Sequence, residues 1–358
     1  MTLRVGLIGC GHIGTFHARN IKDVQSRGLV DIDYHAVCDH DIERAETFAS
    51  IAGCALATED PADVIAACDA IYVCTDTAGH PPLVMAAAAA GRHVFCEKPL
   101  ARTLAEAKTM TDAVNAAGVT HQVGLVLHHS PVYRVLARRL REAASPVLTA
   151  SLRDDQCFPV GGTYGSSWRA DVARAGGGAL IEHSIHDVDL LRQLFGDIES
   201  VRCHTRNVAG HPGIEDVAVA MFSHTGGTTS TLTSVWHDVV SRQSSRHLEV
   251  FCSNLRVETH HDYFGTLTEE RDDDPALTLS GDEVLARFME LEGLHPRDED
   301  LRGLAGLSDR RFLEAASRGR PATPSFDDAL VAHGIVDACY RSAAEGRDVT
   351  VGKPDAPT

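Results

Sequence analysis

The stretch RVGLIGCGHIG, residues 4–14, is an apolar run that leads directly into closely spaced glycines. Its second half matches the pattern G-x-G-x-x-G, and residues 4–8 before it are typical of a buried strand. In such a turn Gly9 permits the tight bend, Gly11 lets the backbone approach a pyrophosphate, and Gly14 lets the next helix pack against the strand. The N-terminus of that helix offers free N–H groups and a partial positive charge to phosphates. The context predicts a dinucleotide-binding site.

An acidic residue supports this interpretation. Asp39 stands at the end of the second predicted strand, residues 34–38, where a carboxylate can accept hydrogen bonds from a ribose hydroxyl. The same carboxylate repels a 2′-phosphate, and His40 and Asp41 supply no arginine for one, so NAD is favoured over NADP. Two alternatives remain open: a glycine-rich turn without a ligand, and an FAD site, although nothing else in the chain indicates a flavin domain.

Short apolar runs alternate with helical patterns over the first 125 residues. The predicted strands are residues 4–8, 34–38, 70–74, 93–96 and 120–123. Strands that alternate with helices in this way predict a doubly wound parallel sheet with helices on both faces.

The rhythm changes near residue 125, where strand-like stretches begin to dominate. They cover residues 146–157, 198–205, 215–223, 228–236 and 248–260, with one helical segment at residues 178–195 and further helices from residue 282 onward. The chain is therefore expected to be an α/β protein of two domains. Residues 1–125 form an NAD-binding Rossmann domain, and residues 126–358 form an α+β domain for substrate binding and oligomerisation, with a large, mostly antiparallel open sheet.

Composition and charge exclude several classes of protein. The 358 residues include 33 Lys and Arg against 50 Asp and Glu, a formal net charge of −17, which argues against binding to nucleic acid or to an anionic membrane. No run of about 18 apolar residues is present, and the N-terminal residues do not resemble a secretory signal. The 10 cysteines form no Cys-x-x-Cys pair, which favours a reduced, cytoplasmic protein over a disulfide scaffold.

The first candidate for chemistry is Glu97-Lys98-Pro99, which follows the predicted strand at residues 93–96. Strand ends at this edge of a parallel sheet face the ligand crevice, so Lys98 is placed to contact both a nicotinamide and a substrate hydroxyl. Its ammonium would stabilise a developing alkoxide, and the positive charge of oxidised nicotinamide would lower its pKa. Taken alone, Lys-Pro is more typical of a solvated lysine before a turn proline.

A second group of polar residues follows three consecutive glycines at residues 176–178. On one helix over residues 178–195, Glu182, His186 and Asp189 would lie at i, i+4 and i+7 on one face. A histidine titrates near the working pH and a carboxylate can orient it, so this face suits proton transfer. The alternatives are a polar face turned to solvent and a histidine satisfied in the core.

The same segment raises the question of a catalytic metal. Glu182, His183 and His186 fit neither His-Glu-x-x-His nor His-x-x-Glu-His, and on a helix Glu182 and His183 would point to different sides. No catalytic metal is therefore expected.

In this order the motifs resemble the Gfo/Idh/MocA family of nicotinamide-dependent oxidoreductases, over nearly the whole chain. The resemblance rests on the glycine turn with Asp39, Glu97-Lys98-Pro99, Ser167-Trp168-Arg169, the triple glycine with its acid and histidine, and Phe312-Leu313-Glu314-Ala315 leading to Arg318-Gly319-Arg320-Pro321. It implies hydride transfer at a carbinol carbon of a cyclic polyol or sugar, inositol-like, in a homodimer or homotetramer.

The resemblance also implies roles for individual residues. Lys98 matches the family's catalytic lysine and His186 its general acid/base, while Glu182 stands where many members carry aspartate and would support proton transfer. The implied cofactor-binding residues are Gly9, Gly11, His12, Ile13, Gly14, Asp39, Thr75, His80, Glu97 and Lys98. Asp76 departs from the proline usual in the loop that holds Thr75 and His80.

Planar and charged side chains suit sugar hydroxyls, and the candidates for the substrate rim are Asp155, Trp168, Arg169, His183 and His186. His128 and His129 replace the arginine or asparagine often seen after the sixth strand. They either line the substrate pocket or face solvent.

Two other functions fit the same sequence. One is a nucleotide-binding regulator without turnover, which has no need of both Lys98 and His186. The other is an enzyme that uses tightly bound NAD transiently for redox-neutral chemistry.

Overall fold

Six parallel strands form the first sheet of the computed structural model, which describes residues 2–161, 165–272, 275–294 and 304–352. The strands are β1 (Leu3–Ile8), β2 (Ile32–Cys38), β3 (Leu56–Thr58), β4 (Ala70–Val73), β5 (His93–Cys96) and β6 (His121–Val123). Their order is β3-β2-β1-β4-β5-β6, which confirms the doubly wound parallel sheet. The sequence does not reveal the edge strand β3, because its three residues are too few to form a strand-like run.

Helices connect these strands, and local capping signals fix where they begin and end. They are α1 (His12–Ser26), α2 (Ile42–Ala52), α3 (Pro61–Ala67), α4 (His80–Ala89) and α5 (Leu104–Ala117). Asp60 accepts a hydrogen bond from the backbone N of Ala62 at the start of α3, and Thr103 accepts one from Glu106 at the start of α5. Gly118 ends α5 in the left-handed conformation.

Nine strands form the second sheet, which confirms a large, mostly antiparallel sheet. They are β7 (Val147–Cys157), β8 (Ile198–Arg206), β9 (Val217–His224), β10 (Thr229–His237), β11 (Ser245–Cys252), β12 (Leu255–Thr259), β13 (Leu267–Arg271), β14 (Leu277–Leu279) and β15 (Val349–Thr350). The order is β14-β13-β12-β11-β7-β10-β9-β8-β15, and only β7 and β10 pair in parallel. The single strand expected over residues 248–260 is wrong, because Ser253 and Asn254 turn the chain between β11 and β12.

The expected single helix over residues 178–195 is also wrong. It is two helices, α8 (Ala179–Glu182) and α9 (Ile185–Phe195), separated by His183 and Ser184. Both of these side chains contact Asp154 on β7: His183 Nε2 lies 3.0 Å from Oδ1, and Ser184 Oγ donates to Oδ2 at 2.7 Å. Tertiary hydrogen bonds to a buried carboxylate therefore override the helical periodicity at this point.

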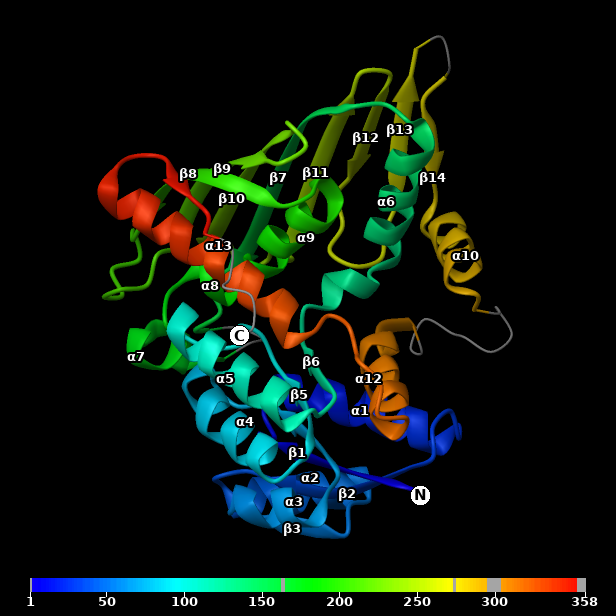
Figure 1. Cartoon of the computed structure of the whole chain (residues 1–358), viewed down its shortest axis with the longest axis vertical. Coiled ribbons are helices and arrows are strands. Elements are labelled where there is room, and N and C mark those ends of the chain that lie inside the picture. Colours follow the sequence, from blue (N-terminus) through cyan, green and yellow to red (C-terminus); the bar gives the residue numbers. More distant parts are fainter. Residues whose placement is uncertain (1, 162–164, 273–274, 295–303, 353–358) are drawn as a thin grey trace.

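The C-terminal part of the chain returns to the first sheet. The remaining helices are α6 (Pro131–Ala143), α7 (Val172–Ala175), α10 (Gly281–Glu292), α12 (Leu307–Ser317) and α13 (Phe326–Glu345). In Figure 1, α13 runs between the half that holds the first sheet and the half that holds the second, and it contacts both α5 and β8. The domain division at residue 125 stays a prediction. No helix within the described ranges is long and apolar enough to cross a membrane.

Helix α12 packs on the N-terminal domain through apolar contacts. Phe312 and Leu313 are fully buried in one cluster with Leu7 of β1, Tyr72 of β4 and Phe95 of β5. The ring of Phe312 meets the rings of Tyr72 and Phe95 edge-on, with centroids 5.4 and 5.6 Å apart.

A buried chain of charges joins the same elements. His17 of α1 lies between two carboxylates, with Nε2 at 3.0 Å from Glu97 and Nδ1 at 2.6 Å from Asp309 of α12. Burial by itself lowers the pKa of His17, but the two carboxylates outweigh it and raise that pKa to about 10. His17 is therefore a buried cation at neutral pH, and it holds α12 and the end of β5 against α1.

Removal of this cation is expected to destabilise the protein. His17→Gln leaves two buried carboxylates without a positive partner, which costs about 3–5 kcal/mol of unfolding free energy. The pKa of His17 is raised from 6.5 to about 10, so its stabilising effect is complete below pH 6.5 and is lost as the pH rises through about 10. Denaturant unfolding at a series of pH values measures the difference.

The matched control is Lys108→Gln, which breaks an exposed ion pair with Asp112 on α5. Such pairs contribute about 0–1 kcal/mol, so this variant is expected to unfold close to the parent. A His17→Gln variant as stable as Lys108→Gln at neutral pH would show that the buried charges do not hold α12 in place.

Candidate active site

In the glycine turn after β1, the fold requires glycine at positions 9 and 14 but not at position 11. Gly9 has φ +105°, and a Cβ there would lie 2.6 Å from the carbonyl of Cys74. A Cβ on Gly14 would lie 2.1 Å from the oxygen of Gly9. A Cβ on Gly11, in contrast, would meet nothing within 4 Å. The fold alone does not explain the glycine at position 11, whereas close approach of a ligand does.

The first turn of α1 holds the predicted cofactor residues His12 and Ile13. Gly11 is its N-cap and supplies no side chain to the first backbone N–H groups of the helix. Those groups have no partner within a helix, so this N-terminus is suited to an anion such as a pyrophosphate.

Asp39 follows β2 directly and its carboxylate is fixed beside the glycine turn. One oxygen accepts a hydrogen bond from the backbone N of Cys10 at 2.9 Å, and the other accepts one from Asp41 at 3.1 Å. The structure adds Arg44 of α2, which sequence reasoning missed: its guanidinium lies 3.3 Å from Asp39 and is half exposed. Its only signal in the sequence is its place in the first turn of the helix after Asp39.

His80 is buried and contacts backbone on two neighbouring loops. Its Nδ1 lies 3.0 Å from the carbonyl of Pro99 and its Nε2 lies 3.3 Å from that of Thr75. Burial lowers the pKa of His80, so the neutral ring donates to one of these carbonyls at a time. The Thr75 hydroxyl donates to the carbonyl of Asp76, whose carboxylate accepts from Gly79 and pairs with Arg174.

Glu97 faces the interior of the N-terminal domain. Its carboxylate contacts His17 and accepts a hydrogen bond from the backbone N of Lys98 at 3.1 Å. Although burial opposes it, the His17 cation holds the pKa of Glu97 below its usual value. The contacts of Glu97 therefore fix the backbone that carries Lys98.

Lys98 reaches across to the C-terminal domain. Its Nζ donates to the backbone carbonyl of Glu182 at 2.6 Å. Burial lowers the pKa of Lys98; Glu182 opposes this shift, and the charge of Arg169 adds to it. The carboxylate of Glu182 is used by two other groups, because it accepts from the Thr77 hydroxyl at 2.7 Å and from Arg169 at 3.1 Å.

His186 lies four residues after Glu182, near the start of α9. Its Nδ1 is buried and has no hydrogen-bond partner among the described residues. Burial, and then the positive charges of Lys98 and Arg246, hold the pKa of His186 well below its usual value. The charge of Lys98 thus reaches His186, and an unpartnered buried nitrogen calls for an explanation such as a ligand.

A buried ionic network behind His186 was missed by sequence reasoning. Arg246 of β11 donates to Asp187 at 2.6 Å and lies 3.8 Å from Asp154, which in turn contacts His183 at 3.0 Å. Despite burial, Arg246 and His183 keep the pKa of Asp154 below its usual range. Burial raises the pKa of Asp187 well above its usual range, although Arg246 opposes it.

Strand alternation could have marked Asp154 as buried, but not its partner across the sheet. Asp154 shares the buried face of β7 with Ala150 and Leu152, and its register partner on β11 is Arg246. Asp155 lies on the opposite face of β7, where it pairs with Arg242 at 2.8 Å and Arg153 at 3.1 Å. The structure does not bring Asp155 together with the other candidates for the substrate rim.

Trp168 and Arg169 lie together near Glu182. The guanidinium of Arg169 stacks 4.3 Å from the centroid of the Trp168 ring and also binds the carboxylate of Glu182. Arg169 thus links Trp168 to Glu182, whose backbone carbonyl accepts the hydrogen bond from Lys98.

The other polar residues of the predicted helical face are used elsewhere. Asp189 is buried and contacts His128 Nε2 at 2.6 Å, so it does not share a site with Glu182 and His186. His129 is buried between the carbonyl of Thr323 and Arg311; burial and then Arg311 lower its pKa to about 3. The solvent-exposed alternative is therefore wrong for His129.

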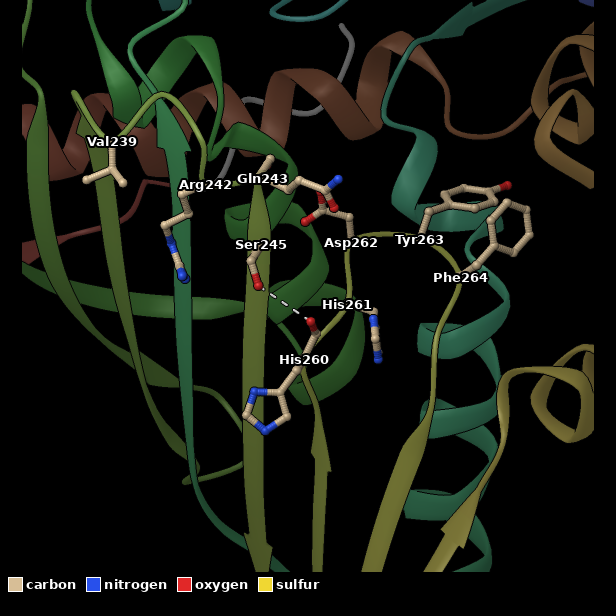
Figure 2. A pocket seen from close by; sticks show the side chains of 10 residues that line it. Val239, Arg242, Gln243, Ser245, His260, His261, Asp262, Tyr263 and Phe264 are labelled. Atoms are coloured by element: carbon tan, nitrogen blue, oxygen red, sulfur yellow. Dashed lines mark hydrogen bonds between the residues drawn. The ribbon is translucent and has the colours of Figure 1, made fainter.

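An open hollow of about 790 Å³ lies beside this network, at the start of β11. Residues 239, 242–245 and 260–264 line it, and Figure 2 shows their side chains between two loops. Its only link to the network described above is Asp262, which pairs with Arg246 at 3.2 Å. Lys98, Glu182 and His186 are not part of its lining.

Comparisons with known proteins identify the family of the chain. The model of the oxidoreductase family with an NAD-binding Rossmann fold matches residues 3–125, and that of the GFO/IDH/MocA C-terminal domain matches residues 147–258. Inositol 2-dehydrogenase of Paracoccus denitrificans is 30% identical over 100% of this chain and 99% of its own. Myo-inositol 2-dehydrogenase of Thermotoga maritima is 28% identical over 97% and 98%.

Solved structures show the same fold. Levoglucosan dehydrogenase in complex with NADH superimposes with a TM-score of 0.85 at 23% identity, over 99% of this chain and 100% of that one. The two matched regions and the full-length relatives together give the identity of the family. The chain belongs to the Gfo/Idh/MocA family of NAD-dependent oxidoreductases, which act on CH–OH groups.

Proposed function

We propose that the protein transfers a hydride between a carbinol carbon of a cyclic polyol or sugar, inositol-like, and NAD. The observation that carries the proposal is the hydrogen bond from Lys98 to the backbone at Glu182, four residues before His186, whose buried Nδ1 has no partner among the described residues. Two inositol dehydrogenases match the chain over nearly their full length, which supports a cyclic polyol as the substrate.

The residues around the glycine turn fit the dinucleotide. Gly11 leaves room for a pyrophosphate at the N-terminus of α1, and Asp39 is fixed where a ribose hydroxyl would lie. Bound NAD⁺ supplies the hydride acceptor.

The substrate hydroxyl lies between Lys98 and His186 in the proposed mechanism. The ammonium of Lys98 stabilises the alkoxide as it forms, and the neutral ring of His186 accepts the hydroxyl proton. The carbinol carbon loses its hydride and becomes a carbonyl, so the alcohol is oxidised and one proton remains on the protein. Glu182 positions Lys98 through its backbone carbonyl and holds Arg169 with its carboxylate.

The substrate rim is formed by Trp168, Arg169 and His183. A stacked indole and guanidinium offer a flat apolar face with donors at its edge, which suits a sugar ring with its hydroxyls. His183 is held by Asp154 at 3.0 Å, so its orientation is fixed from the protein side. The position of Asp155 on the other face of β7 gives no support to a role in substrate binding.

A homodimer or homotetramer is part of the proposal. The outer face of the second sheet exposes Val219 and Met221 on β9 and Phe251 on β11, with 44%, 46% and 41% of their surface accessible. Apolar side chains on an open sheet suit face-to-face contact with a second copy of the chain.

NADH formation with a panel of inositols, sugars and linear polyols tests the proposed function. Turnover with at least one cyclic substrate is expected. NAD that binds without turnover on any member of the panel would instead favour the regulator. NAD that stays bound through purification, with substrate consumed and no net NADH, would favour redox-neutral chemistry.

Loss of either proposed catalytic group is expected to slow turnover strongly. Lys98→Met and His186→Ala should each lower kcat at least about 10²-fold, because each removes one group that handles the hydroxyl proton or its charge. NAD affinity, measured by calorimetry, should be retained. Lys108→Met, a change at an exposed lysine of α5, is the control and should keep the parent rate. Near-normal turnover of either active-site variant contradicts the assignment.

The two glycines of the turn are expected to differ when changed to alanine. Gly11→Ala places its Cβ in open space, so the fold is kept while NAD binds at least about tenfold more weakly. Gly14→Ala places its Cβ 2.1 Å from the oxygen of Gly9 and should lower the melting temperature. Calorimetric titration and thermal unfolding separate the effects. A Gly11→Ala variant with parental NAD affinity would show that the pyrophosphate does not bind at this turn.

Asp39 and Arg44 are expected to set the choice of cofactor in opposite directions. Asp39→Ala should weaken NAD and improve NADP, because the repelling carboxylate is gone and Arg44, left with its 3.5 Å contact to Asp41, can pair with a 2′-phosphate. The double variant Asp39→Ala/Arg44→Ala should lose that gain. The ratio of kcat/KM for the two cofactors measures it, and a parent enzyme that already prefers NADP contradicts this role of Asp39.

A further inference from the structure

Two histidines and a glutamate gather on the outer face of the second sheet. The register of β11 and β12 pairs Leu248 with Thr259, so His247 lies opposite His260, just beyond the end of β12. Glu258 precedes His260 by two residues and therefore shares its face of the sheet. In Figure 2 the ring of His260 lies over β11, apart from the side chains of Asp262 and Tyr263.

The potential metal-ligand atoms of the three side chains lie near one another. One potential ligand atom from each of His247, Glu258 and His260 lies within 4.8 Å of the other two. The two imidazole rings are stacked, with centroids 3.9 Å apart and planes inclined by 17°, so the rings must turn out of this stack before both can direct an in-plane lone pair at one ion. His260 Nε2 also contacts Glu258 Oε1.

The position of His247 Nε2 is the most informative detail. This nitrogen is buried and makes no hydrogen bond within the described residues, yet it lies 3.3 Å from Glu258 Oε1. The two atoms are therefore close without being aligned for a hydrogen bond. Ligands of tetrahedral Zn²⁺, with bonds of about 2.0–2.1 Å, are separated by about 3.3 Å, and their lone pairs point to a common centre and not at each other.

Both carboxylates and arginines surround these three residues, and Arg153 on β7 is the register partner of His247. Arg256 pairs with the second carboxylate oxygen of Glu258, and it also contacts Glu249 and Glu270. Three carboxylates therefore surround one guanidinium, and Oε1 of Glu258 faces the histidines.

We propose that His247 Nε2, His260 Nε2 and Glu258 Oε1 form a binding site for a divalent transition metal of the Zn²⁺ class, with water as the fourth ligand. Two imidazoles and one carboxylate suit Zn²⁺ and disfavour Mg²⁺ and Ca²⁺, which take oxygen ligands. Arg256 contacts the other oxygen of the Glu258 carboxylate and so fixes its orientation, as hydrogen-bond partners of metal ligands commonly do.

The metal site is independent of the proposed reaction. His247 and Arg246 are adjacent on β11 and point to opposite faces of the sheet, so the metal lies away from the network behind His186. A bound ion joins β11 to β12 and adds to the stability of this part of the sheet.

Titration of tag-free, chelator-treated full-length protein with ZnCl₂ tests the site. One equivalent is expected to bind per chain, and CoCl₂ is expected to give the visible absorption of a four-coordinate site. His247→Gln, His260→Gln and Glu258→Gln should each weaken Zn²⁺ binding at least about tenfold, with NAD binding retained.

His237→Gln is the matched control. His237 lies on the same outer face, 3.6 Å from the single carboxylate of Asp155, and has no second histidine ligand beside it. Its Zn²⁺ affinity should equal that of the parent. Affinity weaker than about 1 mM in the parent, or an equal loss in His237→Gln, or unchanged binding in the three Gln variants, would each overturn the proposed site.

Discussion

The hydrogen bond from Lys98 to the carbonyl of Glu182 is the contact on which the candidate site depends. It joins positions 84 residues apart, one at the end of a strand in the first sheet and the other at the end of a short helix under the second. It links the loop that carries Lys98 to the segment that leads into α9, which carries His186. Every other feature of the site either holds one of these partners or shapes the space between them.

Buried ion pairs hold the segments that carry Lys98 and His186. On the N-terminal side, the His17 cation is matched by Glu97 and Asp309. On the C-terminal side, Arg246 is matched by Asp154 and Asp187. Buried ion networks are costly when incomplete, so each network fixes the geometry of the elements that it joins. The site is thus rigid on both sides of the seam, while the ring of His186 is left with an unpartnered nitrogen.

Local spacing explains what could be predicted from the sequence. The glycine turn, Asp39 at the end of β2 and Lys98 at the end of β5 all depend on a strand followed by its own loop, and the predicted parallel sheet is confirmed. The network of Asp154, Asp187 and Arg246 depends on the register of β7 with β11, which no local pattern records. The helix break at His183 likewise comes from hydrogen bonds to a distant strand, so the helical periodicity misplaced Asp189.

The packing of α12 has a consequence for how the chain acquires its fold during synthesis. Phe312, Leu313 and Ala316 complete an apolar cluster whose other members lie within the first 95 residues. A nascent chain that has emerged only through the first sheet therefore presents Tyr72 and Phe95 without their cover, and His17 without Asp309. The domain that is translated first is among the last to be finished, and until residues 307–317 leave the ribosome its uncovered aromatic side chains are a surface that chaperones or neighbouring chains can bind.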